Sequence, residues 1–127
     1  MELQDLTHRV IGCAIAVHKE LGPGFLESIY EEALVIEFNK ARVEYKRQVT
    51  LPVYYSSAKA GQYRLDFLAA STLVVELKAI SELEDIHFVI VRSYLKAARL
   101  KHGPLLNFAS MPLTTKRLIF ERPGHHS

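Results

Sequence analysis

Gly61-Gln62-Tyr63-Arg64-Leu65-Asp66-Phe67-Leu68-Ala69-Ala70-Ser71-Thr72-Leu73-Val74-Val75-Glu76-Leu77-Lys78-Ala79 contains two segments in which apolar residues recur at every second position. This period of two is typical of half-buried β-strands, and residues 69–72 can form the turn that joins them. In a hairpin centred near Ser71, Asp66 and Glu76 fall opposite one another on one face, with Lys78 one pleat beyond Glu76. The stretch therefore predicts an acidic pair beside an ammonium group.

The three charged residues of this hairpin have two interpretations. Burying them costs free energy unless something pairs with them or binds them. Two carboxylates suit a hard cation such as Mg²⁺, and Lys78 could then hold a water or stabilise negative charge in a transition state. Alternatively, Lys78 forms a salt bridge with Glu76 or Asp66 and no chemistry takes place. The pattern alone favours the salt bridge, so a metal site needs support from the rest of the chain.

The segments on either side extend the hairpin into an α/β domain. Residues 43–55 alternate between apolar and polar and predict a preceding strand with a bend at Pro52. Before this strand, apolar residues at helical spacing predict two helices, one at residues 3–21 and one that begins near residues 25–27 and runs to about residue 41, separated by Gly22-Pro23-Gly24. After the hairpin we expect a helix at residues 86–100 and short strands at 105–108 and 116–120.

The helix predicted at residues 86–100 has an apolar stripe and a basic side. The stripe, which we expect to face the sheet, consists of Ile86, Val89, Ile90, Ser93, Tyr94, Ala97 and Leu100. Arg92, Lys96 and Arg99 lie toward the other side. They belong to a basic C-terminal third, in which residues 86–127 hold seven Lys or Arg but a single acid, Glu121. These three cations are candidates for nucleic-acid binding, and a solvated basic face is an equally good explanation.

Length and composition set further limits. A chain of 127 residues, 49% of them hydrophobic, suits one core, so we expect a single domain over residues 1–122 and a disordered tail at 123–127. No apolar run approaches the roughly 20 residues of a membrane span, and the first residues lack the pattern of a signal peptide. We therefore expect a soluble, cytoplasmic protein. The single cysteine, Cys13, excludes an internal disulfide, and no Cys/His cluster has zinc spacing.

Glu27 opens the second predicted helix. An acidic residue is favoured there by the helix dipole alone, which gives a purely structural interpretation. Alternatively, Glu27 points back to the acidic face of the sheet, because it lies next to a tight Gly-Pro-Gly turn and one helical turn before Tyr30.

Several ordered blocks of the sequence resemble the GxxExxY protein family. The first is Gly24-Phe25-Leu26-Glu27-Ser28-Ile29-Tyr30, which has the spacing that names the family. The other blocks are residues 11–12, 17–24, 30–34, 63–66, 75–79 and 105–108, so the resemblance extends over nearly the whole chain. That family is similar to the PD-(D/E)XK phosphodiesterases. The resemblance implies an α/β fold with a restriction endonuclease-like αβββαβ core, in which helices flank a mixed central sheet.

The resemblance also implies an activity, that of a metal-dependent phosphodiesterase acting on DNA or RNA. Asp66 and Glu76 would ligate Mg²⁺ or Mn²⁺, Lys78 would position the attacking water, and Glu27 would complete the acidic, metal-binding site. Three further residues are accessory candidates: Tyr30, Arg64 and His87. Because small nucleases of this fold often act in pairs, the resemblance is compatible with a homodimer.

The chain departs from the family at the start of the third predicted helix. Where family members would carry His-Glu-Ala-Gln, this chain has His87-Phe88-Val89-Ile90. Ile90 thus replaces a polar group that could contact the site, while His87 is equally a surface residue of the helix start. The departure favours an alternative function, a catalytically weak or inactive nuclease-fold module that binds nucleic acid or a partner protein.

Overall fold

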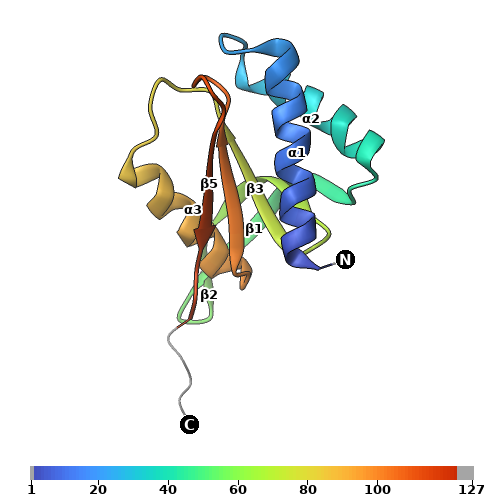
Figure 1. Ribbon diagram of the computed structural model, residues 1–127. Coiled ribbons are helices and arrows are strands. Elements are labelled where there is room, and N and C mark those ends of the chain that lie inside the picture. Colours follow the sequence, from blue (N-terminus) through green and yellow to red (C-terminus); the bar gives the residue numbers. More distant parts are fainter. Residues whose placement is uncertain (1, 123–127) are drawn as a thin grey trace.

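The alternating apolar residues build a five-stranded mixed sheet with helices on both faces (Figure 1). The computed structural model describes residues 2–122, so the predicted tail at 123–127 lies outside the described residues. The elements follow the order α1 (Leu3–Leu21), α2 (Glu27–Ala41), β1 (Tyr45–Tyr55), β2 (Ala58–Ala69), β3 (Leu73–Lys78), α3 (Asp85–Ala98), β4 (His102–Asn107) and β5 (Thr114–Ile119). No helix in the described part of the chain has the length and apolar character needed to cross a membrane.

The strands lie in the sheet in their sequence order, from β1 at one edge to β5 at the other. Among the described strands, β3 and β4 alone pair in parallel, and α3 makes the crossover that a parallel connection requires. The remaining neighbours, β1–β2, β2–β3 and β4–β5, are antiparallel. The predicted α/β class and the restriction endonuclease-like core are thereby confirmed.

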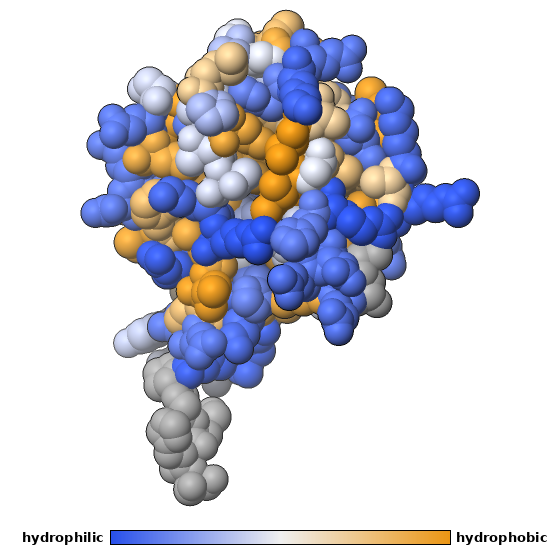
Figure 2. Space-filling model, viewed as in Figure 1, coloured by the Kyte–Doolittle hydropathy of each residue, from blue (hydrophilic) through white to orange (hydrophobic). Residues whose placement is uncertain are grey.

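Two clusters of buried side chains hold the layers together. The larger lies between the sheet and α1 and α2, where Tyr30 stacks on Phe108 at 4.6 Å and Phe38 meets Phe67 edge to face at 5.2 Å between ring centroids. The smaller lies under α3 on the opposite face and includes Val91 and Leu95. Apolar residues also show through along the line where α1 meets the sheet, within a mainly hydrophilic surface (Figure 2).

The predicted inward face of α3 is correct only in part, since Tyr94 and Leu100 pack against the cluster under this helix but the first residues of the stripe do not. Ile86, Val89 and Ile90, which were expected to face the sheet, are 57%, 56% and 40% exposed, whereas Val91 and Leu95 are buried. Apolar residues occur on most sides of this helix, so helical periodicity does not select one of them. The contact with the sheet makes the selection, and it leaves an apolar surface on α3 beside the end of β3.

Strand β4 begins at His102, three residues earlier than predicted, because Gly103 and Pro104 lie inside the strand and do not end the preceding element. A Cβ on Gly103 would lie 3.1 Å from Leu95 Cδ2 and 3.1 Å from the carbonyl oxygen of Val74. The glycine therefore lets α3 pack close to the strands, which explains why a residue usually found in turns occupies a buried strand.

Candidate active site

Strand β2 changes faces at Asp66. Phe67 packs in the cluster under α1 and α2, whereas Leu65 packs in the cluster under α3, although alternate residues of a regular strand share one face. The irregularity lies in β1, where Gln48 adopts a φ of 52° between Arg47, which pairs with Phe67, and Val49, which pairs with Leu65. Asp66 therefore stands where the two strands turn over, between the two helical layers.

The carboxylates of Asp66 and Glu76 replace the next step of the β2–β3 ladder. Backbone pairing between these strands extends only from Ala69–Leu73 to Phe67–Val75. Beyond it, the Asp66 N–H donates to Glu76 Oε2 at 2.7 Å, and the Leu77 N–H donates to Asp66 Oδ2 at 2.9 Å. The two carboxylates are therefore held side by side, as the hairpin register predicted, and each uses one oxygen within the hairpin.

This pair is electrostatically strained. Glu76 is 6% exposed, and burial, followed by the charge of Asp66, raises its pKa to about 9. Burial also raises the pKa of Asp66. The hydrogen bond from the Leu77 N–H acts in the opposite direction, because it stabilises the ionised form. Lys78 favours the charged form of both groups but forms no ion pair with either within the described residues, so the salt-bridge interpretation is wrong. A bound cation would relieve the strain.

Glu27 approaches the pair from α2. Partial desolvation raises the pKa of its carboxyl, and the charge of Asp66 raises it further, while Lys78 acts in the opposite direction. The residue as a whole is exposed. The interpretation in which Glu27 points toward the acidic face therefore agrees with its electrostatic coupling.

The turn before α2 explains how Glu27 is placed. Gly24 has a φ of 108°, a conformation that favours glycine, and the next helix begins three residues later at Glu27. The buried Tyr30 hydroxyl donates to the Gly22 carbonyl at 2.5 Å and accepts the Phe25 N–H at 3.2 Å. Tyr30 thus holds the turn that precedes Glu27, and its accessory role in the site stays a prediction.

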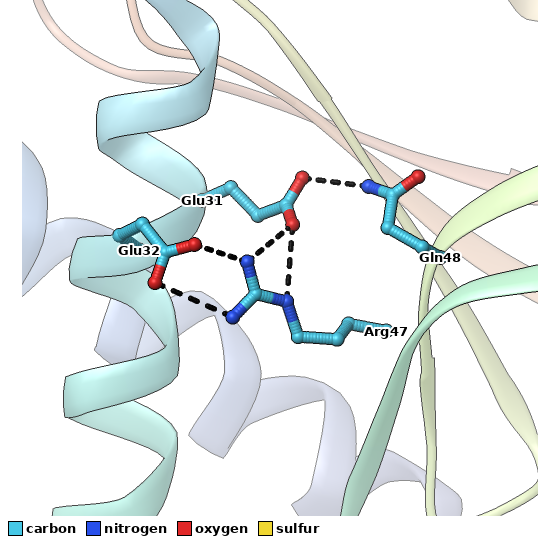
Figure 3. A network of polar contacts seen from close by, with 4 residues as sticks. All are labelled: Glu31, Glu32, Arg47 and Gln48. Atoms are coloured by element: carbon cyan, nitrogen blue, oxygen red, sulfur yellow. Dashed lines mark hydrogen bonds and ion pairs between the residues drawn. The ribbon is translucent and has the colours of Figure 1, made fainter.

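A guanidinium network ties α2 to β1 next to the turnover point (Figure 3). Arg47 donates to Glu31 Oε2 at 2.9 Å and also bonds the Glu32 carboxylate. Gln48 Nε2 donates to Glu31 Oε1 at 2.8 Å. The hydrogen bond to Glu32 raises the pKa of Arg47 the most, and the hydrogen bond to Glu31 raises it further. The network was not predicted, and the sequence signal that could have revealed it is Arg47 itself, a cation in an apolar strand position.

A second framework holds the end of β3, where Lys78 lies. The Lys78 carbonyl accepts the Phe108 N–H at 2.9 Å. Asn107, which is 1% exposed, accepts the Ile80 N–H at 3.1 Å and donates to the Ile80 carbonyl at 2.9 Å. These bonds fasten the end of β3 to β4, so the backbone of Lys78 is rigidly placed.

A small hollow of about 90 Å³ opens beside Glu76 and Lys78 and is closed by one side of α3. His87 lines it and also accepts the Glu84 N–H on Nδ1 at 2.8 Å, so it both stabilises the helix start and belongs to the site lining. Ile90, the apolar residue at which the sequence departs from the GxxExxY pattern, lines the same hollow. Tyr94 also lines it, and its pKa is raised by burial and then by the charge of Glu76. Tyr94 was predicted only as a core residue.

The remaining predicted site residues lie away from the acidic pair. Arg64 is exposed on β2, and the contacts described for residues 2–122 do not connect it to the carboxylates, so its accessory role stays a prediction. Arg92, Lys96 and Arg99 are exposed on or just after α3. Lys96 and Arg99 border a second, larger hollow that Arg92 does not line.

The chemistry of the pair fits a magnesium ion. Within residues 2–122, no three acidic, imidazole or thiol groups converge to form a complete metal cage. Glu27 therefore does not join Asp66 and Glu76 in a three-ligand cluster, and its role as a ligand stays a prediction. Mg²⁺ does not require such a cage, since it is commonly bound by one or two carboxylates and retains several waters. Asp66 and Glu76 supply such a pair, with one oxygen each outside the hairpin bonds.

Comparison with known proteins agrees with this geometry. Residues 4–118 match the family described as the PD-(D/E)XK nuclease superfamily, a match that includes the three helices and the hairpin with Asp66 and Glu76. No curated protein and no solved structure matches the chain. Because the match covers most of the sequence and the mixed sheet has helices on both faces, the chain belongs to the PD-(D/E)XK nuclease superfamily.

Proposed function

We propose that this protein is a metal-dependent phosphodiesterase that hydrolyses DNA or RNA at the Asp66–Glu76 pair. The observation that carries the proposal is the reciprocal bonding of these carboxylates, which holds two acids together in a desolvated place where their ionised forms are unfavourable. Two acids held together in a desolvated place lower the stability of the fold, and a bound cation would offset that cost. Such an arrangement is therefore typical of a functional site. Membership of a nuclease superfamily supports the same conclusion.

Each residue of the site has a distinct task in this proposal. Asp66 and Glu76 would hold Mg²⁺ or Mn²⁺ through their outer oxygens. When bound, the ion supplies positive charge that lowers the pKa of a coordinated water and offsets charge on the phosphate. Lys78, fixed at the end of β3, donates hydrogen bonds to the attacking water or to a phosphate oxygen. Glu27 accepts a proton or orients a water from the α2 side.

Cleavage and metal binding should be measured on the same variants. Labelled single-stranded, duplex and branched DNA and RNA are incubated with Mg²⁺ or Mn²⁺, and metal binding is followed by calorimetry. Asp66→Asn keeps an oxygen that accepts the Leu77 N–H but removes the charge, and Lys78→Met keeps most of the length without the ammonium. Both should abolish cleavage, and Asp66→Asn should also weaken metal binding.

Glu82→Gln is the matched control, because Glu82 is an exposed acid in the connection between β3 and α3. It should cleave and bind metal as the wild type does. Cleavage that persists equally in Asp66→Asn and Lys78→Met would come from a contaminant, and a wild-type protein that binds no divalent metal would refute the catalytic proposal.

The alternative proposal is a binding module that retains the fold without turnover. It is favoured by one observation, that the apolar Ile90 lines the hollow beside Glu76 and Lys78. It predicts nucleic-acid binding that is unaffected by Asp66→Asn and is accompanied by no cleavage. Assignment to the GxxExxY family is likewise a proposal, supported by the sequence blocks described above and by the superfamily match. A cytoplasmic location and a homodimer stay predictions from the sequence.

A further inference from the structure

A hollow of about 430 Å³ lies between the tip of the β1–β2 hairpin and the C-terminal half of α3. Figure 1 shows this tip near the end of β5, where the described chain finishes. The side chains that matter for its chemistry are Tyr54, Tyr63, Ser93, Lys96, Arg99 and Arg122. They come from β1, β2, α3 and the residues after β5, so the hollow exists only in the folded protein.

Among residues 2–122, three cations and no acid line this hollow. Arg122 is held there by donating to the Lys96 carbonyl at 2.9 Å, and it lies 5.9 Å from the centre of the Phe120 ring. Arg99 and Arg122 also border a neighbouring hollow of about 290 Å³ that contains Glu121, whose carboxylate is paired with Lys101 at 3.0 Å. The positive charge of the larger hollow is therefore available to an anionic ligand. Hydrophilic residues cover much of this end of the molecule in Figure 2.

Tyrosines form the other part of the lining and lead to the acidic pair. Tyr54 is 64% exposed, so its ring is accessible to a ligand. Tyr63 packs against Tyr94 with ring centroids 4.6 Å apart, and its hydroxyl lies 3.3 Å from Ser93 Oγ. Tyr94 in turn lines the small hollow with Glu76 and Lys78. The Tyr63–Tyr94 contact therefore connects the lining of the cationic hollow to the lining of the small hollow beside the candidate catalytic residues.

We propose that this hollow binds a single-stranded polynucleotide and guides it to the Asp66–Glu76 pair, with phosphates on Lys96, Arg99 and Arg122 and a base stacked on Tyr54. The path of the polynucleotide toward the acidic pair rests on the proposed nuclease function, but binding in the hollow does not require cleavage. Cations beside an exposed aromatic ring match the chemistry of single-strand binding, in which phosphates and base faces are recognised together. A duplex presents its phosphates but keeps its base faces stacked inside, so Tyr54 would add nothing to its binding.

The test measures binding in EDTA, where a metal-dependent activity is silent. Fluorescence anisotropy compares labelled oligothymidylate, oligouridylate and a hairpin duplex of similar length. The wild type should bind the single strands more tightly than the duplex, with a log–log salt slope of roughly −2 for three phosphate contacts. Tighter binding of oligouridylate would identify RNA as the ligand, and tighter binding of oligothymidylate would identify DNA.

Neighbouring residues supply matched controls. Tyr54→Ala should weaken single-strand binding about tenfold, whereas Tyr55→Ala should not, because Tyr55 is also exposed but does not line the hollow. Lys96→Gln should reduce the magnitude of the salt slope by about 0.7, whereas Lys19→Gln should leave it unchanged, because Lys19 is exposed on α1 and does not line the hollow. Thermal denaturation confirms that each variant folds, as expected for exposed positions.

Failure of this inference and failure of the nuclease proposal give different results. Equal affinity for duplex and single strands, or an unchanged affinity in Tyr54→Ala, would overturn the single-strand site whatever the cleavage assay shows. Conversely, selective single-strand binding that depends on Tyr54 and Lys96 would support the site even for a protein without turnover.

Discussion

The raised pKa of Glu76 predicts that the metal-free protein loses stability as the pH rises. In the unfolded chain the carboxyl has its ordinary pKa of 4.5, and in the folded protein the pKa is about 9. Between these values the folded state holds a proton that the unfolded state has released. The free energy of unfolding therefore falls with pH, and this contribution is complete below pH 4.5 and lost as the pH approaches 9.

The size of the effect follows from a difference of one proton. One proton corresponds to about 1.4 kcal/mol per pH unit, so raising the pH from 6 to 8 removes about 2.7 kcal/mol. For a domain of this size that loss lowers the melting temperature by roughly 10 °C. Glu76→Gln keeps an oxygen that can accept the Asp66 N–H but cannot ionise, so its stability should fall much less over the same range.

The assay is urea denaturation in EDTA at several pH values from 5.5 to 8.5. The difference in unfolding free energy between Glu76→Gln and the wild type should grow with pH, whereas Glu82→Gln should follow the wild type. Parallel curves for Glu76→Gln and the wild type would refute the conclusion that Glu76 is protonated in the folded protein. Adding Mg²⁺ should stabilise the wild type increasingly at higher pH, because the ion binds the ionised pair.

Three further predictions concern how the site is supported, and each is measured as the change in the free energy of urea-induced unfolding. Gly24→Ala should cost about 1–3 kcal/mol because φ is 108° there, whereas Gly61→Ala, where a Cβ meets open space, should change stability by less than about 0.5 kcal/mol; equal effects would contradict the proposed role of the turn. Tyr30→Phe should cost roughly 1–2 kcal/mol by removing the hydroxyl that bonds the turn, and a neutral result would show that the turn does not need it. Val91→Ala should cost roughly 2 kcal/mol and Val89→Ala less than about 0.5 kcal/mol, since Val91 is 3% and Val89 56% exposed; the reverse order would restore the predicted α3 stripe.

The alternation of apolar and polar residues, together with the short turn, was sufficient to predict the acidic pair. Alternation around residues 69–72 places Asp66 opposite Glu76, and the structure has the two groups bonded to each other's strands. The prediction succeeded because a two-residue period and a short turn leave little freedom in register. The reversal of β2 at Asp66 could not be foreseen, because it depends on the positive φ of Gln48 in another strand.

For α3, the limits of prediction have a different origin. Its position and approximate ends follow from composition, but its inward face does not, because Ile86, Val89 and Ile90 are as apolar as the buried Val91 and Leu95. Packing against β4, where Gly103 admits the helix closely, selects the face. The exposed side of α3 then contributes Ile90 to the small hollow and Lys96 to the larger one.

The sequence by itself determined the local structure, that is, the order of helices and strands, the α/β class and the pairing of Asp66 with Glu76. These depend on short-range periodicity and on chain connectivity, which neighbouring residues specify. Only the tertiary structure decided how Glu27, Arg47, Tyr94 and the cationic hollow are placed, because each brings together segments far apart in the chain. Their positions depend on which faces pack and on where buried charges are tolerated, and these are properties of the whole fold.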